Sequence, residues 1–429
     1  MLAKYRDFLL VLTNKFGAAF VGLGITIYFA NEASTEVFGQ YSLLISIVFI
    51  FSSLCCSGCP NLIVSQSAIL RSFNLNRMND IVLKRCIKSS LIWLPFILLI
   101  PLFYEDVKIF TVILISVCIL SRVLIEISGA FLRAKGYQVL GVTFDALLRP
   151  LFFLLLLLIS SRQIISDYYV YGLMISFLIM SALSFTLFKI LVLNKAIGLK
   201  LLFLKRNRKT IAWNQMASDF QYITVFQVLG RHADILIIGL LLSSSDIAIY
   251  SVSVKIAAVI MYVMVASGSV LAPKLSFLKG KENSLISKSL IGYNKITSFI
   301  SFVFLMIFLI FGELFIDFVF GSKYESVTDF LLAALFFEYL IVLLGNSSVA
   351  MNMLGFSSVN YIYFRNTTVI QLVLLGPSIL IFDLWGALFC MSICRIAYRI
   401  RLCIFLREKG ISANYIFYLY NKYTMRKVC

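Results

Sequence analysis

The sequence predicts an all-α integral membrane protein with about 12 transmembrane helices, in two six-helix lobes related by a pseudo-twofold axis along the membrane normal. Three observations predict this class. Of the 429 residues, 61% are hydrophobic and 14% are charged, whereas a soluble domain carries about 25% charged residues. Uncharged runs long enough for membrane spans recur along the whole chain. The most basic connection, 194–210, separates six such spans from six others.

Windows of about 20 apolar residues place the spans. The predicted order is 8–30, 40–58, 89–103, 109–132, 138–160, 168–191, 211–241, 246–272, 293–319, 328–354, 364–382 and 385–406. The expected domains are an N-terminal lobe (1–193), a basic cytoplasmic linker (194–210), a C-terminal lobe (211–406) and a basic cytoplasmic tail (407–429). A Tyr-Ser pair opens both the second span, at Tyr41, and the eighth, at Tyr250, which supports two equivalent halves.

The formal net charge of +18 does not indicate a nucleic-acid partner, because most cations lie in short segments on one side of the predicted spans. The opposite segments hold only Lys108, Arg162 and Lys323. By the positive-inside rule both termini are cytoplasmic. The outer loops are too short to fold into a domain, so we expect no enzyme and no catalytic residue.

Nine cysteines and one histidine give no metal-binding spacing, so we expect no metal and no cofactor. Cys55, Cys56 and Cys59 are close in sequence but lie at the end of a predicted span. They are expected to be inert packing residues.

Several charges fall inside the spans, where each costs about 2.5 to 3.5 kcal/mol unless it is paired or hydrated. Arg122 and Glu126 are four residues apart, as are Asp145 and Arg149, so each can pair within its helix or with its neighbour. The alternative is that Glu126 or Asp145 titrates near neutral pH and carries a coupling proton.

Charges in two later spans allow similar interpretations. Glu338 in span 328–354 is a similar carboxylate, and Arg395 in span 385–406 is its candidate partner. Glu313 and Asp317 lie near the outer end of their span, where a solvated rim explains them.

The seventh span carries a polar stripe. At 100° per residue Gln227, Arg231 and Asp234 share one face, with Asp219 on the same half of the helix. We expect this face to line a cavity, although an internal Arg231–Asp234 pair is an alternative. His232 points away from the stripe and is expected to serve in packing.

Lys15 and Lys255 have no acidic residue one helical turn away. Each lies about 10 to 15 Å inside its span, too deep to reach the surface easily. Unpaired cations from both lobes would form an anion site. Gly17, Gly22 and Gly24 keep the first span thin, for close packing or for a bulky ligand.

The ordered motifs of the chain resemble the O-antigen flippases (Wzx-type) of the polysaccharide transporter family, in the multidrug, oligosaccharidyl-lipid and polysaccharide exporter superfamily. The matching residues are Arg231-His-Ala-Asp234-Ile-Leu-Ile-Ile-Gly239, Tyr250-Ser-Val-Ser-Val-Lys255, Ala272-Pro273-Lys274, Phe320-Gly321-Ser-Lys-Tyr324, Phe38-Gly39-Gln-Tyr41 and Trp385-Gly386-Ala387. Ala248 and Ile249 stand where the family usually has a glycine before the tyrosine.

This resemblance implies an alternating-access flippase of the bacterial cytoplasmic (inner) membrane that moves an undecaprenyl-pyrophosphate-linked oligosaccharide to the outer leaflet. Besides this substrate and membrane lipids, the implied partners are an O-antigen polymerase and a chain-length regulator. By helix position Lys15, Arg231 and Lys255 are the candidates for binding pyrophosphate. The candidates for ion coupling or cavity carboxylates are Asp145, Glu126, Asp234 and Asp219, and those for lining the cavity are Arg149, Arg122 and Gln227.

Coupling to a proton or sodium gradient is a further hypothesis. The runner-up function is a cation-coupled drug exporter of the same superfamily. Such an exporter would favour an acidic cavity, whereas the cavity charges expected here are positive and favour an anionic substrate.

Overall fold

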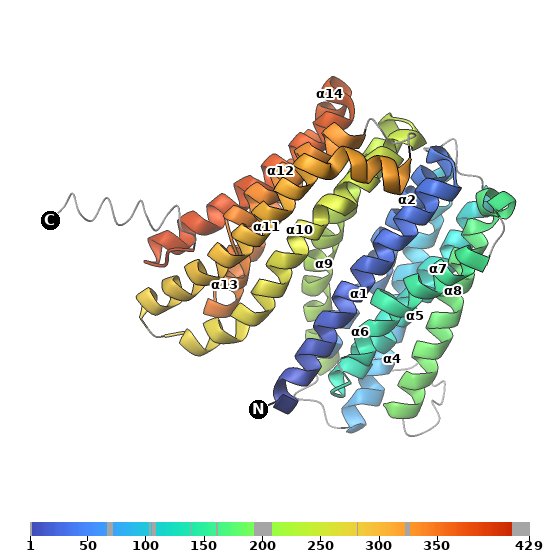
Figure 1. Ribbon diagram of the computed structural model, residues 1–429. Helices are drawn as coiled ribbons and strands as arrows, with labels where there is room; N and C mark the ends of the chain where they lie inside the picture. Colours follow the sequence, from blue (N-terminus) through green and yellow to red (C-terminus); the bar gives the residue numbers. More distant parts are fainter. Residues whose placement is uncertain are drawn as a thin grey trace. The chain divides into compact units, whose positions relative to one another are not determined.

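The structure, a computed structural model, describes residues 2–66, 72–102, 104, 109–137, 139–159, 162–192, 208–280, 282–321 and 327–413. Every regular element in these ranges is helical, as predicted (Figure 1). The helices are α1 (Leu2–Glu32), α2 (Thr35–Cys56), α3 (Cys59–Gln66), α4 (Ser72–Ile97), η1 (Ile100–Leu102), α5 (Ile109–Ala134), α6 (Leu140–Thr143), η2 (Phe144–Leu148), α7 (Arg149–Ile159), α8 (Arg162–Leu191), α9 (Arg208–Leu241), α10 (Ser244–Leu278), α11 (Asn283–Phe320), α12 (Val327–Leu343), α13 (Ser347–Leu354) and α14 (Ser357–Glu408).

Ten of the described helical stretches are long and apolar enough to cross a membrane, and Phe16–Glu32 of α1 is a shorter apolar stretch. The predicted spans 364–382 and 385–406 both lie within α14, whose backbone leaves the helical region at Phe382 and Asp383. A Cβ on Gly386 would lie 1.9 Å from the carbonyl oxygen of Ser378, so the chain folds back on itself here. The two predicted spans are therefore two antiparallel helices.

Three features differ from the prediction. Helix α3 was not predicted, because eight residues are too short for a spanning segment. Span 138–160 is interrupted by the π-helical turn η2. Span 328–354 is interrupted between α12 and α13, where Gly345 has a φ of 74°. Each interruption spans only a few residues between apolar helices, so a window of about 20 residues passes over it.

The chain groups into two compact units, Met1–Ile247 and Ala248–Cys429. In the first unit α5 is central and packs against α2, α3, α4 and α8. It meets α6 where Gly129 and Gly141 face each other, and a Cβ on either glycine would lie 2.4 Å from the other's carbonyl oxygen. Helix α9 packs against α2 and α3 and so belongs to this unit. The lobe boundary near 194–210 remains a prediction.

Helix α9 is held against α2 by backbone approaches and by one arginine. Gly58 has a φ of 72°, and a Cβ there would lie 2.1 Å from the carbonyl oxygen of Ala217. The Arg85 guanidinium donates to the carbonyl and hydroxyl oxygens of Ser57 at 3.1 and 3.0 Å, and to the hydroxyl of Ser218 at 2.8 Å. Arg85 therefore ties the end of α2 to α9.

The second unit has an apolar core shared by α10, α11, α13 and α14. The break between α12 and α13 is held by amides. Asn294 donates to the carbonyl oxygen of Ala413 at 2.5 Å and accepts from the backbone N–H of Asn346 at 3.2 Å. A Cβ on Gly345 would lie 2.0 Å from the Asn294 amide nitrogen, so this position requires glycine.

Candidate functional site

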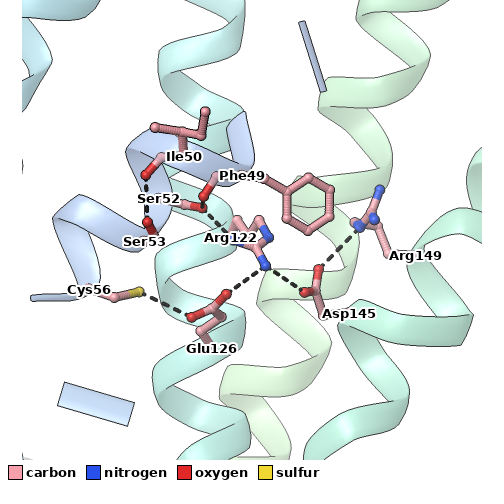
Figure 2. A network of polar contacts seen from close by, with 9 residues as sticks. All are labelled: Phe49, Ile50, Ser52, Ser53, Cys56, Arg122, Glu126, Asp145 and Arg149. Atoms are coloured by element: carbon pink, nitrogen blue, oxygen red, sulfur yellow. Dashed lines mark hydrogen bonds and ion pairs between the residues drawn. The ribbon is translucent and has the colours of Figure 1, made fainter. Parts of the chain in front are cut away.

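The main polar cluster of the first unit lies where α2, α5 and the η2–α7 segment meet (Figure 2). Asp145 lies in the π-helical turn η2, and Arg149 begins α7. Pro150 has no N–H and cannot donate to the carbonyl of Ala146 one turn earlier. A π-turn here widens the helix where that bond is missing, and such turns are frequent at functional sites.

Arg122 is the centre of this cluster. One of its terminal nitrogens lies 2.6 Å from a Glu126 carboxylate oxygen and 3.1 Å from a carboxylate oxygen of Asp145. The other donates to the hydroxyl of Ser52. The second oxygen of Asp145 lies 3.3 Å from Nε of Arg149. Two cations and two carboxylates therefore form one charge-balanced network, which Figure 2 shows as a continuous chain of contacts.

Aromatic rings cover the two arginines. The Arg122 guanidinium carbon lies 4.1 Å from the ring centre of Phe49, and that of Arg149 lies 4.5 Å from the ring centre of Phe177. Nε of Arg122 is buried and, among the described residues, has no hydrogen-bond partner. The contact with the electron-rich face of Phe49 offsets part of that cost.

The two carboxylates are more accessible than the arginines. The side chains of Glu126 and Asp145 are 24% and 25% exposed, against 8% for Arg122 and 7% for Arg149. The thiol of Cys56 donates to the second oxygen of Glu126 at 3.5 Å. The two carboxylates are therefore the more accessible groups of this network, while the arginines stay buried as their counter-charges.

The sequence predicted the two pairs, Arg122 with Glu126 and Asp145 with Arg149, and the structure confirms both. It also joins them through Arg122 and Asp145. The contacts that α2 makes with this network were not predicted from the sequence. A signal was present, because Phe49, Ser52 and Cys56 follow at i, i+3 and i+7, the spacing of one helix face.

The predicted stripe of α9 meets two environments. Gln227, Arg231 and Asp219 are exposed, whereas Asp234 is buried and accepts a hydrogen bond from the backbone N–H of Ile235 at 2.9 Å. His232 stacks on Phe49 of α2, with ring centres 5.1 Å apart and planes at 8°. This contact agrees with the packing role expected for His232.

The remaining predicted cations lie apart from this cluster in the sequence. Lys15 is in α1, and its side chain lies outside the described residues. Lys255 is in α10 of the second unit and is half-buried. In α1, a Cβ on Gly17 or Gly24 would meet a leucine side chain of the η2–α7 segment at 3.1 or 3.4 Å, so both glycines serve close packing, while Gly22 faces open space.

In the second unit, the predicted partnership of Glu338 and Arg395 is confirmed. Both terminal nitrogens of Arg395 contact the Glu338 carboxylate, one of them at 3.1 Å. Helix α12 is thereby joined to the last part of α14. The Arg395 side chain is 36% exposed and that of Glu338 is 10% exposed.

The described residues contain no group of three or more His, Cys, Asp or Glu side chains that could hold a metal ion. Cys55, Cys56 and Cys59 are buried and free. The site offers two carboxylates, two guanidinium groups, a hydroxyl and a thiol, which suit ion exchange and conformational coupling.

The comparisons with known proteins place the chain. The family described as "Polysaccharide biosynthesis protein" matches residues 33–329. No curated protein matches the sequence. Among similar solved structures, the lipid II flippase MurJ in an inward closed conformation has a TM-score of 0.74 and 14% identity, over 93% of this chain and 87% of that one. A multidrug resistance MATE family transporter of the MOP superfamily in an inward-facing conformation has a TM-score of 0.69 and 13% identity, over 91% of this chain and 94% of that one. The MATE multidrug transporter DinF-BH in complex with R6G has a TM-score of 0.61 and 15% identity, over 93% of this chain and 94% of that one.

At these identities the similar structures establish the fold, a multi-pass helical membrane architecture. The family match is stronger evidence, because it spans more than half of the sequence. The chain therefore belongs to the polysaccharide biosynthesis protein family and has the fold shared by MurJ and the MATE transporters.

Proposed function

We propose that this chain is a flippase that moves an undecaprenyl-pyrophosphate-linked oligosaccharide repeat unit from the inner to the outer leaflet of the bacterial cytoplasmic membrane by alternating access. The observation that carries the proposal is the match to a polysaccharide biosynthesis family in a chain whose described part includes ten helices long and apolar enough to cross a membrane. MurJ, whose name states that it flips lipid II, has a similar fold.

The physical need for such a protein is clear. A pyrophosphate in hydrocarbon costs tens of kcal/mol, and each unpaired sugar hydroxyl adds about 2 to 7 kcal/mol. Spontaneous flipping of a lipid-linked oligosaccharide is therefore negligible. A hydrated, cationic path that leaves the lipid tail in the bilayer removes most of this barrier.

We further propose that Lys15, Arg231 and Lys255 engage the pyrophosphate. Support comes from the exposed position of Arg231 on α9 and the half-buried position of Lys255 on α10, both within apolar spanning helices. Gln227, exposed four residues before Arg231, would contact the sugar or phosphate from the same helix.

The carboxylates Asp145 and Glu126 are the proposed ion carriers, with Asp234 and Asp219 of α9 as further candidates. The partial exposure of Asp145 and Glu126 supports their access to protons or sodium ions. Moving an anion outward is favoured by about 2.3 kcal/mol per charge per 100 mV. The proton or sodium gradient would therefore serve to return the empty protein to the conformation that accepts the next substrate. Arg122 and Arg149 would act as counter-charges at the edge of the cavity.

The proposed orientation places both termini in the cytoplasm of the inner membrane, which the distribution of lysine and arginine supports. An O-antigen polymerase and a chain-length regulator are the proposed partners, because a flipped repeat unit must be joined into a polymer on the outer side.

The test is flipping by the purified protein in proteoliposomes. Lipid-linked oligosaccharide that becomes accessible to an external glycosidase is measured over time, with imposed proton, sodium or no gradient. Protein-dependent exposure of the glycan supports the function. An equal rate of flipping with and without either gradient would contradict the proposed ion coupling. If the vesicles instead transport cationic dyes and leave the oligosaccharide lipid in place, the drug-exporter alternative holds.

The proposed pyrophosphate residues have their own test. Lys15→Ala and Lys255→Ala should abolish surface glycan in cells at near-normal protein abundance, and Lys→Arg at either position should partly restore it, since a cation is kept. Normal surface glycan in both alanine variants would contradict the anion site.

A further inference from the structure

One aromatic ring contacts both the ion-pair network and helix α9. Phe49 of α2 lies against the guanidinium of Arg122, at 4.1 Å, and against the imidazole of His232, at 5.1 Å. The Arg149 guanidinium carbon is 6.0 Å from the same ring centre. His232 directly follows Arg231 in the chain, so Phe49 connects the neighbourhood of a proposed substrate residue to the proposed ion carriers.

The geometry of Arg122 makes the network sensitive to small movements. A single nitrogen serves two carboxylates, at 2.6 Å for Glu126 and 3.1 Å for Asp145. A hydrogen bond prefers a donor angle above about 150° and weakens steeply below about 120°, so a small rotation of the donor group changes its strength. A small shift of the guanidinium therefore changes how the positive charge is shared between the two acids.

Few contacts fix the plane of this guanidinium. Its Nε is buried without a hydrogen-bond partner among the described residues, so the plane is set by Ser52, the two acids and the face of Phe49. Among these contacts, Phe49 also contacts α9, through His232. The imidazole lies nearly parallel to the ring, at 8°, so a displacement of α9 acts directly on the ring.

We infer that Phe49 and His232 are positioning residues that transmit movements of α9 to Arg122, and that they thereby set which of Glu126 and Asp145 it neutralises. This inference rests on the proposed transport function for its biological meaning. The aromatic link itself is a property of the fold and can be tested without transport.

The first experiment uses the fact that the chain has one histidine. Full-length protein labelled selectively at the histidine Cε1 gives one imidazole NMR signal in detergent micelles. Phe49→Leu should shift this signal, because the ring stacked on it is lost. Asp145→Asn should also shift it, through Arg122 and Phe49. Glu313→Gln, which removes an exposed carboxylate of the second unit, should leave it unchanged.

The second experiment measures flipping in proteoliposomes. Phe49→Leu should lower kcat about tenfold, with KM for the lipid substrate within about twofold, since a desolvated cation–π contact is lost and substrate contacts are kept. Phe49→Tyr should restore most of kcat. His232→Leu should behave like Phe49→Leu, and His232→Phe, which keeps a flat ring, should restore most of the rate.

The matched control is Phe188→Leu. Phe188 is buried and stacks on Phe131 with ring centres 5.0 Å apart, in the same unit, and among the described residues no arginine or lysine stacks on its ring. This variant should lose stability and keep the kcat of the folded fraction and the histidine signal.

The inference is overturned if Asp145→Asn leaves the histidine signal unchanged, or if Phe49→Leu flips with wild-type kcat. It is also overturned if Phe188→Leu lowers kcat as much as Phe49→Leu, because ordinary packing would then explain the effect. If the wild-type protein flips no oligosaccharide lipid, the proposed function fails. The effects of Phe49→Leu and Asp145→Asn on the histidine signal then still test whether Phe49 links Arg122 to His232.

Discussion

The two units hold polar groups in their interiors in different ways. The first concentrates charge: Arg122, Glu126, Asp145 and Arg149 form one balanced network. The second relies mainly on neutral groups. Asn294 and Asn346 hold the break after α12, while Tyr398 donates to Asn360 at 2.6 Å and Asn360 donates to Asn352 at 2.8 Å.

This difference indicates where the binding of a proton or a cation can change the contacts between helices. A network of shared ion pairs has alternative pairings of similar energy, which one proton or cation can exchange. Hydrogen bonds between buried amides have no such alternatives, because a broken bond leaves an unsatisfied group. We therefore expect ion coupling in the first unit and rigid support at the α12–α13 break of the second.

The largest effect is expected at Arg122. Arg122→Ala removes the cation shared by two acids and should lower the free energy of unfolding by about 3 to 5 kcal/mol and abolish flipping. Thermal unfolding in detergent and the proteoliposome assay measure the two effects. Combining it with Asp145→Asn should recover part of the stability, because one unpaired charge is removed. No recovery in the double variant would contradict a shared network.

A smaller loss is expected at the neutral counterpart in the second unit. Asn294→Ala removes the hydrogen bonds to the Asn346 N–H and to the Ala413 carbonyl. At about 0.5 to 1.5 kcal/mol for each bond, the two should together cost about 1 to 3 kcal/mol. The flipping of the folded fraction should respond to the ion gradients as in the wild type. A changed gradient response would show that switching is not confined to the first unit.

The ion pair of the second unit should matter less than that of the first. Arg395→Ala should lower the free energy of unfolding by about 2 kcal/mol, as expected for hydrogen bonds to a charged group. Arg395 is 36% exposed, and water weakens its pairing with Glu338. Unfolding in detergent compares this variant directly with Arg122→Ala. An equal loss of unfolding free energy in Arg395→Ala and Arg122→Ala would contradict the expected difference between the two units.

The smallest effect on stability is expected at Pro150. Pro150→Ala restores a backbone N–H and should change the free energy of unfolding by less than about 1 kcal/mol, since the π-turn already accommodates proline. It should nevertheless weaken the gradient dependence of flipping, because a regular helix would reorient Asp145. The matched control is Pro377→Ala in α14 of the second unit, which should leave transport unchanged.

Local patterns explain which features the sequence predicted. The apolar windows found the spanning helices, and the spacing of four residues found the pairs of Arg122 with Glu126 and of Asp145 with Arg149. The expected break before Trp385 coincides with the non-helical backbone at Asp383. Pro60 in the first turn of α3 is a helix-start signal that could have revealed this short helix.

Other features depend on contacts between distant segments. The two ion pairs can join only if α5 and η2 face each other, and the residue spacing within either helix does not predict that contact. The place of Phe49 between Arg122 and His232 needs three helices at once. The attachment of α9 to the first unit follows from the glycine at position 58 and from Arg85, whose partners lie far away along the chain.

By itself the sequence determined the class of protein, the helical spans and the helix faces that carry charge, since hydropathy and the 3.6-residue period are local properties. The tertiary structure alone decided which charges share partners, which acids stay accessible and which ring links α9 to them. The physical reason is that pairing and desolvation depend on separations of a few ångströms between side chains on different helices, and these separations exist only once the helices have packed.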